Sequence, residues 1–366
     1  MKITRIEPIL LAIPYEHGAP KSVMATGTLR TTMDALYLRV ETDQGLVGWG
    51  EAFGFACCAV THAAVERALA PLAIGREIDD IAALMHDLHR RLQNMGRNGP
   101  VSFALSGLDI ALWDIAGQVA GMPIYRLLGG DGKKTRVPAY ASLLRIGTPE
   151  HVARVAAGAV ERGYRSIKLH ERTYEAVAAA RAAAGPDVAL MLDTNCTWTP
   201  DEAVAMARRL GGYDLAWLEE PVFPPDDYAG LARVRRAGGI AVAAGENLGN
   251  LQEVMRIIAA GAIDIIQPDP TKIGGISECW KSLETAGHLG MRAEPHSPYY
   301  GPGLAASLHL IAAMPGEVMC EFYYADLAAS PLGDMIYPQG GFLGVPDAPG
   351  LGIRVDEDIV ARYRVR

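Results

Sequence analysis

The chain has 366 residues, of which 50% are hydrophobic and 21% are charged, and its formal net charge is -8 with a sequence pI near 5.6. This length and composition are sufficient for a large globular domain with a smaller one beside it. The acidic balance argues against a surface for nucleic acid or an anionic membrane, because both need clustered Lys and Arg, so we expect neither partner.

The cysteines and the apolar segments bear on cellular location. The five cysteines, Cys57, Cys58, Cys196, Cys279 and Cys320, show no CxxC pairing and predict neither a disulfide framework nor a zinc site. No apolar stretch approaches the roughly 20 residues of a membrane-spanning helix, and the N-terminus lacks a signal-peptide core. We therefore expect a cytoplasmic protein with reduced thiols.

Residues 1–125 predict an α+β domain. Residues 3–13 and 34–41 have the pattern of strands, and a turn at 43–45 leads into a hairpin partner at 46–50. Helical segments follow. The longest covers 101–121, where apolar residues recur on one face, which is more typical of core than of a functional site.

Residues 126–334 alternate regularly between apolar runs and Ala-rich helical segments. The helix predicted at 202–210 is preceded by Thr199 and Pro200 and has Glu202 at its third position, which indicates a capping box. Strand-helix repeats predict a parallel sheet covered by helices, and a closed barrel explains them better than an open sheet. The eight candidate strands are 137–141, 164–168, 188–192, 215–218, 240–243, 263–266, 291–294 and 318–320. Residues 335–366, rich in Gly and Pro, are expected to return to the N-terminal domain.

Acidic and histidine residues recur at the ends of the barrel strands. By subtraction of their numbers the intervals are 23 to 27 residues, about one strand, one helix and two turns. In a barrel these strand ends converge on one mouth, so we expect a shared site there. The residues are His170, Asp193, Glu219, Glu246, Asp269, His296 and Glu321.

Three carboxylates stand at consecutive strand ends: Asp193, Glu219 and Glu246. Close together and partly desolvated, they would repel one another unless a cation neutralised them. Oxygen-only ligands favour Mg²⁺ over Zn²⁺. For any one of them, a helix cap or an Arg partner is an equally plausible role, but three in successive units favour a metal site.

Two further pairs suggest proton transfer. Adjacent strand ends would let Asp269 accept a hydrogen bond from one imidazole nitrogen of His296, leaving the other nitrogen to act as a general base. Across the mouth, the period-2 alternation of a strand sends Lys168 and His170 to the same side, where both can point into the barrel.

With these motifs the chain resembles the enolase superfamily, and within it the mandelate racemase-like subgroup. The resemblance covers essentially the full length and includes the segments 106–114 and 272–275 and the tail sequence ending at Gly352. It implies an α/β fold, a (β/α)7β TIM-like barrel with an α+β capping domain formed by both ends of the chain. It also implies one Mg²⁺ per active site, held by Asp193, Glu219 and Glu246.

The same resemblance assigns roles to the remaining residues. It makes Asp269 and His296 the general-base dyad and Glu321 the carboxyl group beside the substrate carboxylate. Lys168 and His170 are similar to a Lys-x-Lys pair, with His170 replacing the second Lys. Cap loops at 15–31 and 51–58 are expected to close over the mouth.

The chemistry implied is removal of the proton next to a carboxylate through an enediolate stabilised by the metal. Because His170 replaces a Lys, we predict dehydration of an acid sugar to a 2-keto-3-deoxy acid. The alternatives are a racemase or epimerase with His170 and His296 as opposed bases, and, from another class, a non-catalytic carboxylate-binding or scaffold protein.

Three further residues are candidates for contacts with the substrate, and the protein is expected to assemble with copies of itself. Asn195, Trp198 and His17 are candidate substrate-binding residues, although Trp198 could equally be a packing residue. The expected partners are a small-molecule carboxylate and further copies of the chain, in a homo-oligomer between a dimer and an octamer.

Overall fold

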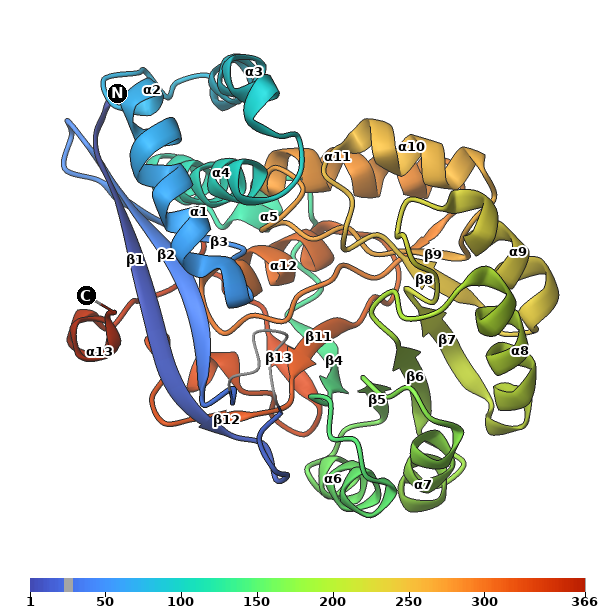
Figure 1. Cartoon of the computed structure of the whole chain (residues 1–366). Helices are drawn as coiled ribbons and strands as arrows, with labels where there is room; N and C mark the ends of the chain where they lie inside the picture. The colour runs from blue at the N-terminus through green and yellow to red at the C-terminus, as the bar shows by residue number, and fades with distance from the viewer. Residues whose placement is uncertain (23–28, 366) are drawn as a thin grey trace.

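The computed structural model describes residues 1–22 and 29–365, so residues 23–28 of the predicted cap loop at 15–31 lie outside the described residues. An antiparallel sheet with helices packed on it lies beside a barrel of parallel strands (Figure 1). The fold predicted from the sequence is therefore confirmed.

The antiparallel sheet has the order β12-β1-β2-β3. Its long strands are β1 (Ile3–Glu16), β2 (Thr32–Thr42) and β3 (Val47–Ala52), with β2 and β3 joined by the predicted turn. The helices of this part are α1 (Cys58–Ala64), α2 (Ala70–Ala73), α3 (Ile81–Leu92), α4 (Pro100–Ala120) and α5 (Ile124–Leu127). Asp80 caps α3 by accepting a hydrogen bond from the Ala83 N–H.

Helix α4 is buried more completely than its sequence predicts. Its apolar stripe predicts one buried face, but the polar side chains of Ser102, Asp109 and Asp114 are buried as well. The reason is that β3 covers one side of α4 while the barrel helix α11 (Gly275–His288) covers another. By length and composition α4 could cross a membrane, yet 72% of its most apolar window is buried inside the molecule, as in a core helix.

The barrel contains the eight predicted strands, paired in the order β10-β9-β8-β7-β6-β5-β4-β11. They are β4 (Arg136–Ser142), β5 (Ser166–Leu169), β6 (Ala189–Asp193), β7 (Leu215–Glu219), β8 (Val242–Ala244), β9 (Ile265–Ile266), β10 (Arg292–Ala293) and β11 (Cys320–Tyr323). The helices between them are α6 (Pro149–Glu161), α7 (Tyr174–Ala184), α8 (Pro200–Leu210), α9 (Tyr228–Gly238), α10 (Leu251–Ala259), α11 and α12 (Pro302–Ala313). The capping box of Thr199 and Glu202 at the start of α8 is present as predicted.

Strands β8, β9 and β10 are shorter than predicted and end before their functional residues. Glu246, Asp269 and His296 therefore lie in the segments that follow these strands. Strands β8 and β9 begin two residues later than predicted, and β10 loses one residue at each end. Hydrogen bonds in the loops, such as His296 N–H to Pro268 O at 3.3 Å, continue where the strands end.

The last part of the chain contacts both the cap and the barrel. Strand β12 (Asp326–Leu327) pairs with the end of β1, and α13 (Glu357–Tyr363) packs beside β1. Strand β13 (Phe342–Gly344) instead pairs with the beginning of β4, so the tail also extends the barrel sheet. Asp114 of α4 ties the tail down by accepting a hydrogen bond from the Leu351 N–H at 2.8 Å.

The close approach of β3 and α4 gives a test of this packing. A Cβ atom on Gly50 would lie 1.9 Å from the carbonyl oxygen of Gly107, so Gly50→Ala forces the two elements apart. We expect the free energy of unfolding to fall by about 1–3 kcal/mol or more, measured by chemical denaturation. Gly211→Ala is the control, because no atom lies within 4 Å of a Cβ there. Equal stability of the two variants would contradict this packing.

Candidate active site

The three predicted metal ligands lie together at the barrel mouth. Asp193 ends β6, Glu219 ends β7 and Glu246 follows β8, and one oxygen from each lies within 4.8 Å of the others. Glu219 also accepts hydrogen bonds from Trp217 Nε1 and Gln267 Nε2, both at 2.8 Å. The donor set consists of carboxylate oxygens alone, which suits a hard divalent cation such as Mg²⁺.

Lys168 is completely buried among carboxylates at the centre of the mouth. Its Nζ lies 2.7 Å from Glu219 Oε1, 2.9 Å from Glu321 Oε1 and 3.7 Å from Asp193 Oδ2. Burial alone disfavours the ammonium ion, but attraction to Glu219 and Glu321 raises the pKa of Lys168 well above its ordinary value. One ammonium does not balance the three carboxylates that surround it, so the site needs further positive charge.

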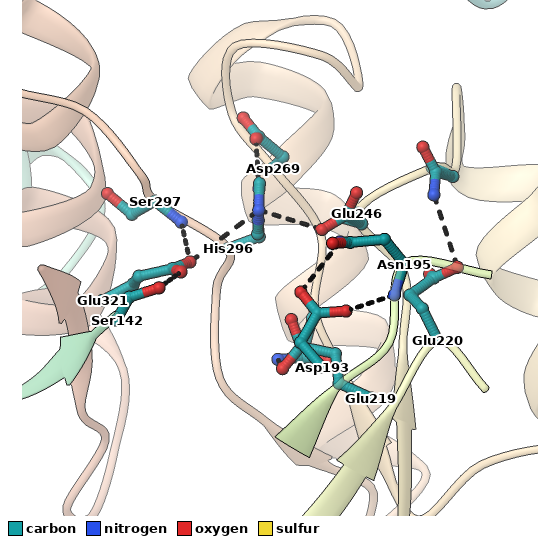
Figure 2. A network of polar contacts seen from close by, with 12 residues as sticks. Ser142, Asp193, Asn195, Glu219, Glu220, Glu246, Asp269, His296, Ser297 and Glu321 are labelled. Carbon is teal, nitrogen blue, oxygen red and sulfur yellow. Dashed lines mark hydrogen bonds and ion pairs between the residues drawn. The ribbon is translucent and has the colours of Figure 1, made fainter. Parts of the chain in front are cut away.

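Asp269 and His296 form the predicted dyad. His296 Nδ1 lies 2.6 Å from Asp269 Oδ2, and the other imidazole nitrogen, Nε2, lies 3.0 Å from Glu246 Oε2 (Figure 2). Burial lowers the pKa of His296, but Glu246 and Glu321 outweigh burial and raise that pKa well above its usual value. Since Nδ1 donates to Asp269, Nε2 is the nitrogen at the mouth that can exchange a proton.

His170 lies on the other side of the metal ligands with a related arrangement. Its Nε2 is 3.1 Å from Asp193 Oδ2, and its Nδ1 donates to the carbonyl oxygen of Leu143 at 2.6 Å. The imidazole ring also meets that of Tyr323 edge to face, with centroids 6.3 Å apart. The two histidines thus differ in the acceptor behind Nδ1, a carboxylate for His296 and a neutral carbonyl for His170.

Glu321 is held as a carboxylate beside Lys168. Ser142 Oγ donates to its Oε1 at 2.7 Å and the Ser297 N–H donates to its Oε2 at 3.0 Å, as Figure 2 shows. Although burial opposes ionisation, Lys168 and His296 lower the pKa of Glu321 to about 2.

The three candidate substrate-binding residues have different surroundings. Asn195 donates from its backbone N and from Nδ2 to the two oxygens of Asp193, at 2.8 and 3.0 Å, so it orients that carboxylate. Trp198 is buried in the main apolar core, which agrees with the packing role left open by the sequence. His17 is buried and stacks on Tyr15 in the cap, with ring centroids 5.6 Å apart.

The sequence did not predict the groups that hold Asp269. Thr271 donates from its backbone N and from Oγ1 to Asp269 Oδ1, at 2.7 and 2.9 Å, and the Tyr299 hydroxyl donates to Oδ2. The Asp-x-Thr spacing could have indicated the contact with Thr271, because an Asp side chain often accepts a hydrogen bond from the backbone two residues further on. Tyr299 lies in another loop, and no local pattern points to it.

Lys272 is another residue whose place in the site was not predicted from the sequence. Its Nζ lies 3.1 Å from Asn247 Oδ1 and 3.6 Å from Glu246 Oε1. It therefore supplies a second ammonium at the edge of the metal cluster, near the ligand that Lys168 does not contact.

Comparison with known proteins identifies both parts of the chain. Residues 11–129 match the family model of the mandelate racemase / muconate lactonizing enzyme N-terminal domain, and residues 151–359 match that of the enolase C-terminal domain-like family. The chain is 33% identical to D-galactarolactone cycloisomerase of Agrobacterium fabrum, over 100% of the chain and 99% of that protein. It is 30% identical to arabinonate dehydratase of Saccharolobus solfataricus, over 93% of each.

A solved structure is also similar to this chain over nearly its full length. A racemase from Streptomyces coelicolor with bound magnesium superposes with a TM-score of 0.84 at 27% identity, covering 99% of this chain and 100% of that one. Together with the acidic cluster, this similarity supports binding of Mg²⁺.

Mg²⁺ binding can be tested through stability. Because Mg²⁺ would bind the folded state only, it should raise the melting temperature, and Glu246→Gln should require at least about tenfold more Mg²⁺ for the same rise. Glu175→Gln, which alters an exposed carboxylate on α7, should leave the Mg²⁺ dependence unchanged. A Glu246→Gln protein with the wild-type dependence would show that Glu246 is not a ligand.

Glu51 of β3 gives a pH-dependent test of the contact between cap and barrel. It is buried and accepts a hydrogen bond from the Gly303 N–H at 2.8 Å, and burial followed by repulsion from Asp269 raises its pKa to about 8. The folded state therefore holds a proton that the unfolded chain releases above about pH 4.5, so wild-type stability falls as pH rises from there to about 8.

Glu51→Gln removes this titration and keeps an acceptor for the Gly303 N–H. Relative to wild type, the variant should gain stability by up to about 1.4 kcal/mol per pH unit across that window. Denaturation at about pH 5.5 and pH 8 measures the difference, and an identical difference at both values would rule out the raised pKa.

Proposed function

We propose that this chain, which belongs to the mandelate racemase and muconate lactonizing enzyme group of the enolase superfamily, catalyses β-elimination on an acid sugar. The enzymes of this family that it matches are lyases and isomerases, and the chain is an enzyme of that kind. The observation that carries the proposal is the unequal anchoring of the two histidines.

His296 is the general base in this scheme. Asp269 stabilises the imidazolium that forms when Nε2 takes the proton from the carbon next to the substrate carboxylate, because a carboxylate behind Nδ1 favours the charged ring. Bound Mg²⁺, held by Asp193, Glu219 and Glu246, would supply electrostatic stabilisation for the negative charge that develops on that carboxylate. Lys168 keeps Glu219 and Glu321 in place around it.

His170 is suited to the second half of the reaction. A neutral carbonyl behind Nδ1 fixes the orientation of the ring, and Nε2 faces the mouth across from His296. Burial lowers the pKa of His170, but attraction to Asp193 outweighs burial and raises that pKa, which favours a ring that carries a proton to donate. As an acid, His170 can give a proton to the oxygen that leaves the β-carbon. The C–O bond then breaks, its electron pair goes to the oxygen, and the enol left behind becomes a 2-keto acid.

The leaving oxygen separates two versions of the reaction. A free hydroxyl leaves as water, which is dehydration and gives a 2-keto-3-deoxy acid. A ring oxygen stays attached to the product, so the same step opens a lactone or an anhydro ring without loss of mass. The full-length similarity to D-galactarolactone cycloisomerase favours testing this second version beside the first.

The reaction can be followed by proton NMR in D₂O with Mg²⁺ and a panel of aldonates, aldarates and their lactones. We expect a 2-keto acid carrying solvent deuterium at the carbon that lost oxygen, with mass spectrometry showing whether water was lost. His296→Asn should lower the rate by a factor of about 10² to 10⁴ or more, because general-base catalysis is removed. His288→Asn, at an exposed position at the end of α11, is the control.

His170→Gln separates elimination from epimerisation. If His170 is an acid, this variant should form product slowly while His296 still exchanges the α-proton with solvent. In the wild-type protein, deuterium entering the α-carbon with inversion and without any keto acid would instead identify a racemase or epimerase, and His170→Gln should then abolish the inversion.

A further inference from the structure

A second cavity lies away from the barrel mouth, between the cap and the barrel. Its volume is about 410 Å³, and it is lined by α3 and the start of α4 on one side and by α10 and α11 on the other. These helices lie along the upper edge of the molecule in Figure 1. We call it the α3–α11 cavity, and its volume falls within the range of small-molecule sites.

The walls of the α3–α11 cavity are rich in cationic groups, although the whole chain is acidic. Among the described residues that line the cavity, Glu278 is the only one with a carboxylate, and it is paired with Lys281 at 2.9 Å. The cations come from both domains: Arg90 and Arg97 from the cap, and Arg256 and Lys281 from the barrel.

Neighbouring carboxylates do not neutralise this charge. Asp87, beside the cavity on α3, pairs with Arg90 at 3.3 Å, but it is shared with Arg76 at 2.9 Å and Arg91 at 2.8 Å. Arg97 and Arg256 take part in no ion pair among the described residues, and they approach from opposite walls. Positive charge therefore remains on both sides of the cavity.

One imidazole on the cavity wall lacks a polar partner among the described residues. The start of α11 also lies at this wall, but its Ser277 N–H already donates to the buried carboxylate of Asp109 at 2.9 Å, so this helix terminus already has its anion. His89 Nε2 is buried and has no hydrogen-bond partner within the described part of the chain, which indicates a polar group absent from the wall.

We propose that the α3–α11 cavity binds a small phosphorylated metabolite, with Arg97 and Arg256 as opposed anchors for its phosphate oxygens. Guanidinium groups match phosphate oxygens with two parallel hydrogen bonds. The limited volume of the cavity and the acidic balance of the chain favour a small molecule over a nucleic acid.

The cavity is distinct from the site at the barrel mouth but shares a loop with it. Gly249 and Asn250 line the cavity, three and four residues after the metal-cluster residue Glu246. The cap residue Asn98 holds this loop, because its Nδ2 donates to the Asn247 carbonyl at 2.7 Å. An occupant would thus contact both domains, and we expect it to raise the melting temperature.

Calorimetry on the Mg²⁺-loaded protein tests the proposal, with fructose 1,6-bisphosphate and inorganic phosphate as probes at constant ionic strength. The bisphosphate should bind, and Arg97→Ala and Arg256→Ala should each raise its dissociation constant at least about tenfold, the loss expected for one charge-assisted contact. Arg236→Ala removes one exposed charge from α9 and should leave binding unchanged. Citrate should bind more weakly, because a phosphate site prefers tetrahedral oxygens.

Several results would overturn the proposal. Binding that survives both substitutions would place the phosphate elsewhere, such as the barrel mouth. An equal loss of affinity in Arg236→Ala would show that the effect reflects only the overall charge of the protein. No binding to the wild-type protein, or stronger binding of citrate than of the bisphosphate, would exclude a phosphate site. A Mg²⁺-dependent rise in melting temperature retained by both arginine variants would confirm that they are folded.

Discussion

The structure depends on charge balance around the buried ammonium of Lys168. Three carboxylates, Asp193, Glu219 and Glu321, come within 4 Å of its Nζ from three different strands. Taking such charges out of water is expensive unless they compensate one another, so the strand ends can be this acidic only with a lysine among them. Two of these carboxylates, Asp193 and Glu219, also belong to the group of three whose oxygens suit a divalent cation, so one cluster is suited both to folding and to the proposed chemistry.

The two histidines share a common arrangement and differ in one anchor. Both place Nε2 beside a carboxylate of the acidic cluster, and both anchor Nδ1. A carboxylate anchor stabilises a protonated ring, whereas a carbonyl anchor only orients it, so the two rings are not equivalent. Racemisation needs each ring to act as both acid and base, and elimination assigns them separate roles, so this difference supports the proposed elimination.

The barrel and the main polar contacts were predictable because they follow from periodicity. The spacing of acids and histidines marks the ends of repeated strand-helix units, and the barrel brings those ends together, so the contact between Asp269 and His296 could be predicted. The lengths of β9 and β10 could not, since β9 begins two residues later than its apolar run and β10 pairs at only two residues, and the neighbouring strand decides where pairing occurs. Pairing of β12 with β1 also has no local signal, because it joins Tyr15 to Leu327.

Helix α4 joins the cap to the barrel through hydrogen bonds of its polar side chains. Ser106 Oγ accepts from the Gly274 N–H at 2.8 Å, Asp109 accepts from Ser277, and Ser102 Oγ donates to the carbonyl of Lys272 at 2.9 Å. These contacts fix the loop that begins at Asp269 and ends in α11. Since Lys272 reaches toward Glu246 and Asp269 orients His296, the cap helps to position His296 and one edge of the acidic cluster. A cap that only covered the barrel mouth would need no such contacts, so its attachment is part of the geometry of the candidate site.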